Sequence, residues 1–449
     1  MLYIIYFILH IVITFLLILP FLMVAYVQAN KKKRIKALIS PTTHYSPIPP
    51  TPISKGNINS SSLFDFACII TAYKQLDTAL PLIASLLKQT HPEYVVYIVA
   101  DNCETPTSVA LSARIDLFSH PQVVVLQPDQ ALHSKVKSMQ YALSNFVRRH
   151  EFVVVFDPDN LAAPDFLTVL NSYLAAGYSA VQGKRVAKNL HTRYAAADAL
   201  GEIYKNYIER YVPFVLGSSA TIAGSGMAVA TPLFAAFLDS PQIMQPIKSN
   251  EVIPAEDKLL QNFLIESGLQ IAFAPNAVLY DEKVSTGGQV RRQRTRWLYA
   301  YFENTGQSLH HIFAGLTQAN IPRLIFGLLS VIPPLFLLLG INLLLCLTDL
   351  GLVFIPHLPY VIVPNVLPSF WPLGLFVAQV LCICLFAGNV IWVLYLDKAP
   401  REVWQALTGL PAFIGYQILA MTGIRKAKKD FLTTQHTQQV SIEDVLKKQ

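Results

Sequence analysis

Acidic residues follow two apolar runs of this chain, at the point where each run ends. Asp101 follows the run from Tyr94 to Ala100, and Asp157 and Asp159 follow the run from Phe152 to Phe156. Because the carboxyl ends of parallel strands meet at one edge of an open sheet, we expect these side chains to lie close together. Two aspartates one residue apart can hold a hard divalent cation through oxygen, and that cation can bridge a diphosphate.

Two further groups suited to chemistry lie later in the chain. Asp257, in the sequence Ala-Glu-Asp, has the type needed for a proton acceptor. The run from Gln293 to Trp297 reads Gln-Arg-Thr-Arg-Trp and combines guanidinium groups with an aromatic ring. Such a cluster can bind a pyrophosphate and a ring together. The four groups in this order favour a site for a metal-bound nucleotide.

Each signal also has a structural interpretation. Asp159 or Asn160 could cap the helix expected after Pro164, and Asp101 could be a turn residue in its Asp-Asn pair. Trp297 could anchor the chain at a membrane interface, because apolar segments follow it.

The segment from Phe64 to Trp297 alternates short β-rich runs with helical patterns, which is typical of a doubly wound, Rossmann-like α/β domain. The expected strands are 66–72, 94–100, 122–126 and 152–156, and the expected helices are 76–88, 135–148 and 164–175.

The composition indicates a membrane protein. Hydrophobic residues make up 53% of the chain and charged residues 14%, and the apolar excess lies at the two ends. Residues Leu2 to Val27 are long enough to cross a hydrocarbon core of roughly 30 Å and too long for a signal peptide. The basic run from Lys31 to Lys36 follows directly, so the positive-inside rule places the N-terminus outside and the next domain in the cytoplasm.

The C-terminal third predicts two more crossings, near Leu324 to Leu347 and Leu373 to Leu396, because neither Lys nor Arg occurs from 324 to 396. Prolines between 356 and 368 mark an external loop between them. The stretch from Val403 to Ile424 has basic residues at both ends, so we favour an interfacial or re-entrant helix broken at Pro411 over a fourth span. Residues Leu309 to Leu316 fit another interfacial helix.

The five cysteines predict no disulfide framework, and the net charge of +7 comes largely from runs beside the membrane. We expect contact with anionic lipid and none with nucleic acid, since the expected α/β domain has no basic patch interleaved with stacking aromatics. An oligomer is compatible with this pattern.

These motifs, in this order, resemble the membrane-integrated branch of glycosyltransferase family 2, which has a GT-A fold and includes cellulose, chitin and hyaluronan synthases and ceramide glucosyltransferases. The resemblance covers Phe64 to Trp297, and Gln293-Arg294-Thr295-Arg296-Trp297 matches the family's Gln-x-x-Arg-Trp element in full. It implies an α/β GT-A domain in the cytoplasm between transmembrane helices. It also implies an inverting transfer from a nucleotide donor, typically a UDP-sugar, with Mg²⁺ or Mn²⁺ as cofactor.

The resemblance assigns roles to individual residues. Asp257 corresponds to the general base, and Asp157 and Asp159 to the metal ligands, with Asp159 the direct one. The implied nucleotide-sugar site comprises Thr71, Tyr73, Asp101, Lys135, Asp157, Asp159, Gln293 and Arg296. The implied acceptor site comprises Gly226, Met227, Glu256 and Trp297.

The sequence departs from the family pattern at two places. Ala255 stands where Thr or Gly usually precedes Glu-Asp, which removes a hydroxyl but leaves the base intact. Ser134 replaces a common Gly before Lys135, which puts a pyrophosphate contact there in doubt. The small residues from Gly224 to Met227 resemble an acceptor loop, although glycines also allow close packing.

The predicted organisation is therefore a transmembrane helix at 1–30, a basic and Pro/Ser-rich linker at 31–62, and a GT-A domain at 63–300. An interfacial helix and two transmembrane helices follow at 301–400, and an interfacial helix with a cytoplasmic tail at 401–449. The acceptor stays open between a growing polysaccharide and a single lipid molecule, because both kinds of relative carry Gln-x-x-Arg-Trp. A catalytically silent membrane scaffold is the non-enzymatic alternative.

Overall fold

The structure is a computed structural model that describes residues 2–30, 63–103, 115–249, 251, 253, 255–354, 371–424 and 440–447. Three predicted features lie outside the described residues. They are the basic run and linker at 31–62, the proline breaks at 356–368 and the basic run at 425–429.

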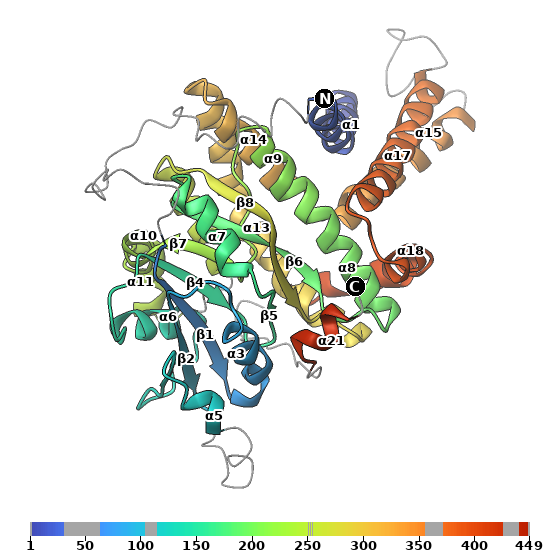
Figure 1. Cartoon of the computed structure of the whole chain (residues 1–449). Helices are drawn as coiled ribbons and strands as arrows, with labels where there is room; N and C mark the ends of the chain where they lie inside the picture. The colour runs from blue at the N-terminus through green and yellow to red at the C-terminus, as the bar shows by residue number, and fades with distance from the viewer. Residues whose placement is uncertain are drawn as a thin grey trace.

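An eight-stranded sheet forms the centre of the α/β domain, in the order β3-β2-β1-β4-β7-β6-β8-β5 (Figure 1). Strands β1 to β4 pair in parallel, as the doubly wound pattern predicts, whereas β7 runs antiparallel to both β4 and β6. The sheet is therefore mixed. The strands are β1 (Phe66–Tyr73), β2 (Tyr94–Asp101), β3 (Val123–Leu126), β4 (Phe152–Phe156), β5 (Leu161–Ala162), β6 (Ala180–Ala187), β7 (Met227–Ala230) and β8 (Ile271–Asp281).

The central strands read as continuous apolar runs because both of their faces are buried. Every residue of β2 and of β4 is buried, and helices cover the two faces of the sheet. Around the sheet lie η1 (Leu76–Ala79), α3 (Leu80–Leu86), α5 (Ile115–Phe118), α6 (Lys135–Ser144), α7 (Phe166–Ala175), α10 (Thr231–Leu238), α11 (Pro241–Lys248), α12 (Glu256–Glu266) and α21 (Ile442–Leu446).

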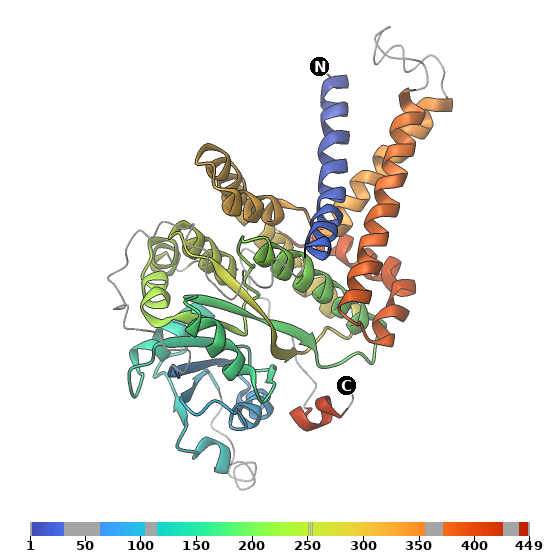
Figure 2. The ribbon, with the colours of Figure 1, turned by 45° about the horizontal axis from the view of Figure 1, so that its top comes forward.

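Three described helices are long and apolar enough to span a membrane: α1 (Leu2–Ala29), α15 (Leu335–Phe354) and α17 (Trp371–Leu396). They project from one side of the α/β domain (Figure 2). The first and third agree with the predicted spans. The second prediction, 324–347, was wrong in its bounds: α14 (Ile321–Val331) ends before Pro333 and Pro334, which cannot continue a helix, and the span begins at Leu335.

The stretch from Leu309 to Leu316 is not a separate helix. It is the end of α13 (Gly287–Thr317), which begins at a capping box formed by Thr286 and Gln289 and continues through the predicted boundary at 300. The stretch from Val403 to Ile424 is broken as expected. It divides into α18 (Arg401–Ala406), a 3₁₀ turn η3 (Leu407–Gly409) and α19 (Leu410–Met421), which starts beside Pro411.

A helical layer joins the sheet to the membrane helices. It consists of α8 (Arg193–Lys205), a π-helical turn η2 (Asn206–Tyr211) and α9 (Val212–Val215). Buried apolar residues of this layer pack with those of α1, α14, α15 and α17. Asn389 of α17 donates to the Tyr204 hydroxyl at 3.2 Å. The sheet and the membrane helices therefore meet across α8 and η2.

Candidate active site at the edge of the sheet

A cavity of about 1070 Å³ opens beside the carboxyl ends of the parallel strands and extends to the membrane helices. Its volume exceeds what one small ligand requires, so it has room for a nucleotide-sugar and an acceptor. Eleven of the thirteen predicted site residues line it, which brings together positions from β1 to α13. They are Thr71, Tyr73, Asp101, Lys135, Asp157, Asp159, Glu256, Asp257, Gln293, Arg296 and Trp297.

Asp101 fixes the loop that precedes α6. Its two carboxylate oxygens accept the backbone N–H groups of Leu132 and His133 at 2.7 and 2.8 Å. Tyr73 lies opposite Asp101 in the β1–β2 register, and its hydroxyl is 3.0 Å from His133 Nδ1. Asp101 is 2% exposed, and its two hydrogen bonds hold the loop at Leu132 and His133 in place as one wall of the cavity.

Lys135 stands at the start of α6, where Ser134 is the N-cap residue and accepts the N–H of Lys137. The Lys135 ammonium donates to Asp157 Oδ1 at 2.8 Å and to the Gly224 carbonyl at 2.9 Å, and lies 3.2 Å from Glu256. Burial alone would lower the pKa of Lys135, but Asp157 and Glu256 raise it above its ordinary value. The lysine is therefore a fixed cation within the cavity.

Asp157 and Asp159 present carboxylate oxygens to the same cavity, a donor type that suits Mg²⁺ or Mn²⁺. The Asp157 side chain is 34% exposed. Asp159 is largely buried, and its Oδ2 accepts the Glu282 N–H at 3.2 Å. No group of three or more metal-binding side chains occurs among the described residues. Asp157 and Asp159 are therefore the two residues of this wall that would hold such a cation.

Asp257 occupies the first turn of α12, where the helix dipole stabilises a negative charge. The Oδ1 atom of Asp257 accepts the Lys258 N–H at 2.8 Å. Gly224 lies beside the other carboxylate oxygen: a Cβ at Gly224 would be 3.8 Å from Asp257 Oδ2. Gly224 has φ +80°, so a side chain there would strain the backbone.

Gly226 and Met227 do not line the cavity, and here the sequence interpretation needs correction. Met227 is 2% exposed and pairs with Val155 and Gln182 within the sheet. A Cβ on Gly226 would meet Leu279 at 2.7 Å, so this glycine permits close packing. The cavity wall is formed instead by Ala223 and Gly224, just before them.

The Gln-Arg-Thr-Arg-Trp run lies on the second and third turns of α13. Gln293 lines the cavity, and its buried Oε1 has no hydrogen-bond partner among the described residues. Arg294 pairs with Asp198 and lies 4.3 Å above the Trp297 ring, and Lys205 lies 4.8 Å from the same ring. Trp297 is therefore held between two cations at the cavity wall.

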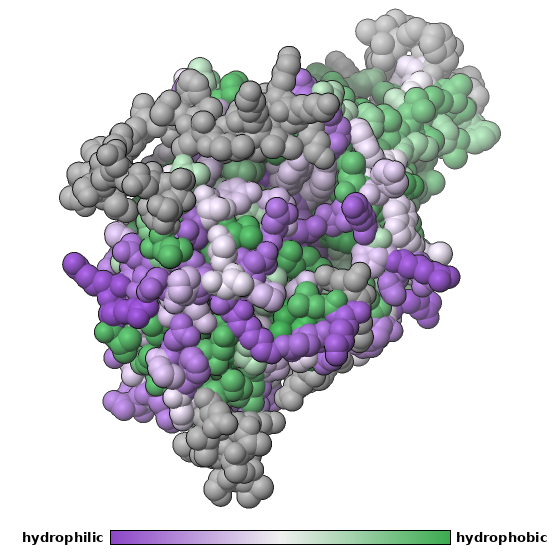
Figure 3. All heavy atoms as spheres, in the orientation of Figure 1, coloured by the Kyte–Doolittle hydropathy of each residue, from purple (hydrophilic) through white to green (hydrophobic). Residues whose placement is uncertain are grey.

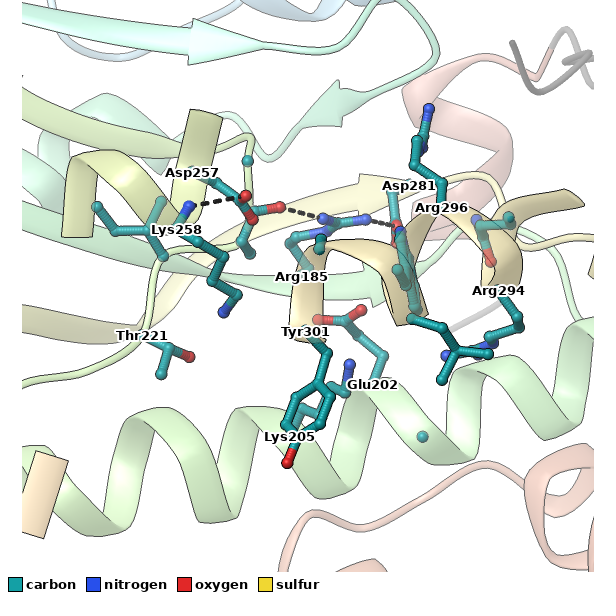
Figure 4. Close-up of a pocket in the computed structure, with 18 of the residues that line it drawn as sticks. Arg185, Glu202, Lys205, Thr221, Asp257, Lys258, Asp281, Arg294, Arg296 and Tyr301 are labelled. Atoms are coloured by element: carbon teal, nitrogen blue, oxygen red, sulfur yellow. Dashed lines mark hydrogen bonds and ion pairs between the residues drawn. The ribbon is translucent and has the colours of Figure 1, made fainter. Parts of the chain in front are cut away.

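Sequence reasoning missed a cluster of buried charges, of which Arg185, Glu202 and Asp281 line the cavity (Figure 4). Arg185 pairs with Asp281, and Lys283 lies 3.0 Å from Asp281 and 3.2 Å from Glu202. Burial alone would raise the pKa of Glu202, but Lys283, Arg185 and Arg210 hold it well below its ordinary value. The signal available in the sequence was weak: charged residues at the ends of two apolar strands, β6 and β8.

The comparisons with known proteins agree with this geometry. The sequence profile described as "Glycosyltransferase like family 2" matches residues 65–300, more than half of the chain. The chain belongs to this family. Its α/β domain is a glycosyltransferase domain, and the silent-scaffold alternative loses its basis. No match appears among curated proteins.

One solved structure supports the GT-A fold of this family 2 glycosyltransferase. A mannosyltransferase from Pyrobaculum calidifontis, in complex with GDP-Man and Mn²⁺, aligns with a TM-score of 0.50 and 13% identity, covering 94% of this chain and 99% of that one. TarS from S. aureus aligns with a TM-score of 0.35 and 13% identity, covering 59% of this chain and 55% of that one. At this identity the first likeness shows the fold alone.

Proposed function

We propose that this protein is a membrane-bound inverting glycosyltransferase that moves a sugar from a nucleotide donor, in the first instance a UDP-sugar, to an acceptor hydroxyl. The observation that carries the proposal is the convergence of Asp157, Asp257 and Trp297 on one cavity, although they come from three separate elements. The basic runs that flank the membrane segments support a cytoplasmic catalytic domain.

The residues suggest a division of labour. Lys135 and the loop fixed by Asp101 would hold the donor's diphosphate and nucleoside. Asp157 and Asp159 would hold a divalent cation, which when bound supplies positive charge to the leaving diphosphate. Gln293 and Arg296 would bind the same diphosphate from α13.

Asp257 would take the proton from the acceptor hydroxyl as that oxygen attacks the anomeric carbon. The new bond from oxygen to carbon replaces the bond to the diphosphate, which leaves with the electron pair. A single displacement inverts the configuration, so an α-linked donor gives a β-linked product. Glu256 and Trp297 would orient the acceptor beside the base.

The proposal is tested by release of nucleoside diphosphate from the purified full-length protein. A panel of UDP- and GDP-linked hexoses is supplied with Mn²⁺, with Mg²⁺ or with a chelator. We expect release with at least one donor, and only when a divalent cation is present. Absence of release with every donor in native membrane lipid would contradict the proposed function.

A further inference from the structure

The cavity has two ends of different chemistry. The end near Asp257 is lined by charged residues, whereas the other end is lined by the membrane helices and by α14 and α19. Each of α1, α14, α15 and α17 contributes aliphatic side chains to this second end, for example Leu16, Leu329, Leu339 and Val390. Among the described lining residues of these helices and the α14–α15 turn, the only polar ones are Ser330 and Gln417. We call this part the apolar end.

The apolar end extends only part of the way along the membrane helices. On α1 the lining residue nearest the N-terminus is Leu16, about 20 Å along the helix from Ala29. On α17 it is Phe386, about 15 Å from Leu396. In the described part of the chain, the cavity therefore reaches roughly halfway along α1, less far along α17, and only about one turn into α15, where the deepest lining residue is Leu339.

Beyond that depth, polar contacts tie the three helices together. His10 of α1 lies 3.1 Å from Asp349 of α15, and Gln379 of α17 donates to Thr14 of α1 at 3.0 Å. His10, Asp349 and Gln379 are each 3% exposed or less. Buried polar contacts of this kind hold membrane helices against one another. The deepest lining residues of the apolar end therefore lie on the catalytic-domain side of these contacts.

We propose that the apolar end holds the hydrocarbon tail of the acceptor, so that the enzyme glycosylates the hydroxylated head group of an amphiphilic lipid. This inference rests on the proposed function and narrows its acceptor. The head group would lie beside Trp297 and Asp257, where the lining changes from apolar to charged, and the tail would run between α1, α14 and α15.

The alternative acceptor, a growing glycan, fits this lining poorly. Sugar hydroxyls need hydrogen-bond partners along the whole path, and leaving them unpaired among aliphatic side chains is unfavourable. A lengthening polymer also requires a polar path across the membrane, whereas beyond the lining residues the helices contact one another through His10 with Asp349 and Gln379 with Thr14. A hydrocarbon tail needs neither polar partners nor an exit.

The test follows the product of the full-length protein in nanodiscs made from a total lipid extract of its source membranes. Nucleotide-sugars labelled with ¹⁴C are supplied, and the products are partitioned between chloroform/methanol and water. We expect the label in the organic phase, as one lipid species with a single added sugar. Label in ethanol-precipitable glycan would overturn this inference and leave the proposed function intact. Absence of nucleotide release would defeat the proposed function itself.

Two substitutions on α15 test whether the hydrocarbon tail of the acceptor lies in the apolar end. Leu339→Trp fills the apolar end, whereas Leu343→Trp adds the same ring at a position of α15 that is 54% exposed and does not line the cavity. We expect Leu339→Trp to lower formation of the lipid product at least tenfold, with unchanged donor hydrolysis in lipid-free detergent and unchanged affinity for nucleoside diphosphate. Leu343→Trp should stay within twofold of the wild type on all three measurements.

A smaller change guards against misfolding. Leu339→Phe adds less volume and should give an intermediate loss of lipid product with normal nucleotide affinity. Equal lipid-product formation by the wild type, Leu339→Phe and Leu339→Trp would show that the tail does not occupy the apolar end, and would overturn the assignment.

Discussion

Lys135 donates a hydrogen bond from its ammonium group to Asp157 Oδ1 across 2.8 Å. The same ammonium lies 3.2 Å from Glu256, the residue before the proposed base. One side chain at the start of α6 therefore links the end of β4 to the start of α12. Asp157 belongs to the proposed donor site and Glu256 precedes the proposed base, so Lys135 connects these two parts of the cavity.

Replacing Lys135 by Met should weaken donor binding. Hydrogen bonds to charged groups contribute about 1.5–3 kcal/mol, so we expect the KM for the nucleotide-sugar to rise roughly tenfold to hundredfold. Steady-state kinetics at saturating acceptor would measure it. Lys88→Met is the matched control, since Lys88 is 52% exposed and does not line the cavity. An unchanged KM in Lys135→Met would contradict the role of Lys135 at the diphosphate.

Asp257→Asn should abolish turnover while leaving nucleotide binding nearly intact. The amide keeps the size of the side chain and can still accept the Lys258 N–H, but it cannot take a proton. General base catalysis contributes about 10²–10⁴-fold, and we expect a fall of that order in single-turnover rate. Asp239→Asn, at an exposed position after α10, is the control. Loss of nucleotide affinity with normal single-turnover chemistry would remove Asp257 from the role of base.

Asp159→Asn should remove the metal dependence of donor binding. The structure makes Asn preferable to Ala here, because the amide oxygen can still accept the Glu282 N–H while the negative charge is lost. Calorimetric titration of nucleoside diphosphate at several Mn²⁺ concentrations would measure the effect. We expect the wild-type affinity to rise with Mn²⁺ and the variant affinity to stay flat. An identical metal response in both proteins would exclude Asp159 as a ligand.

The part of this site that could be predicted from the sequence is the part built at strand ends. Asp101 and Asp157 follow apolar runs, and parallel pairing of β1, β2 and β4 necessarily brings such residues to one edge. The Gln-Arg-Thr-Arg-Trp run was equally visible, since its residues are contiguous.

The cluster of buried charges beside the cavity could not be predicted in the same way. Glu202 and Lys283 meet because α8 packs against β6 and Lys283 follows the end of β8, and that tertiary contact leaves no local pattern in the sequence. The bounds of the second membrane helix failed for a different reason. The residues on both sides of Pro333 are equally apolar, so hydropathy alone does not show where one helix ends and the next begins. The prolines interrupt the helix, and this interruption separates α14 from α15.

We expect the free energy of unfolding to decrease in acid because of His311. This buried residue of α13 accepts from Arg323 Nε at 3.2 Å and lies 3.4 Å from Asn262. Burial, with Arg323 and His310 nearby, lowers the pKa of His311 from 6.5 to about 4. Between pH 6.5 and 4 the unfolded chain therefore binds a proton that the folded chain does not, and stability falls as the pH falls through this window.

Comparison with a His311→Gln variant isolates this effect. A shift of this size corresponds to about 3 kcal/mol at most, and we expect the thermal midpoint of the wild type to fall more steeply than that of the variant between pH 6.5 and 4. His191→Gln, at an exposed position outside α13, should retain the wild-type slope. Parallel pH profiles for the wild type and His311→Gln would contradict the assignment.

The next prediction concerns the orientation of the chain in the membrane. It assumes three crossings, because α19 is too short to cross a bilayer. Its twelve residues span about 18 Å, against a hydrocarbon core of roughly 30 Å. Three crossings then place the segments on either side of the catalytic domain in one compartment, which the basic runs assign to the cytoplasm. In a cysteine-free background that retains nucleotide release, single cysteines are introduced at Ser54, Ser369 and Thr434.

A membrane-impermeant maleimide added to intact cells should label only the cysteine at position 369, which lies between α15 and α17 in the sequence. Labelling of all three after permeabilisation provides the control. Labelling at Thr434 from outside would make the stretch around α18 and α19 a fourth span. Labelling at Ser54 from outside would separate the catalytic domain from cytosolic nucleotide-sugars and defeat the cytoplasmic assignment, because the donor and the site would then lie on opposite sides of the membrane.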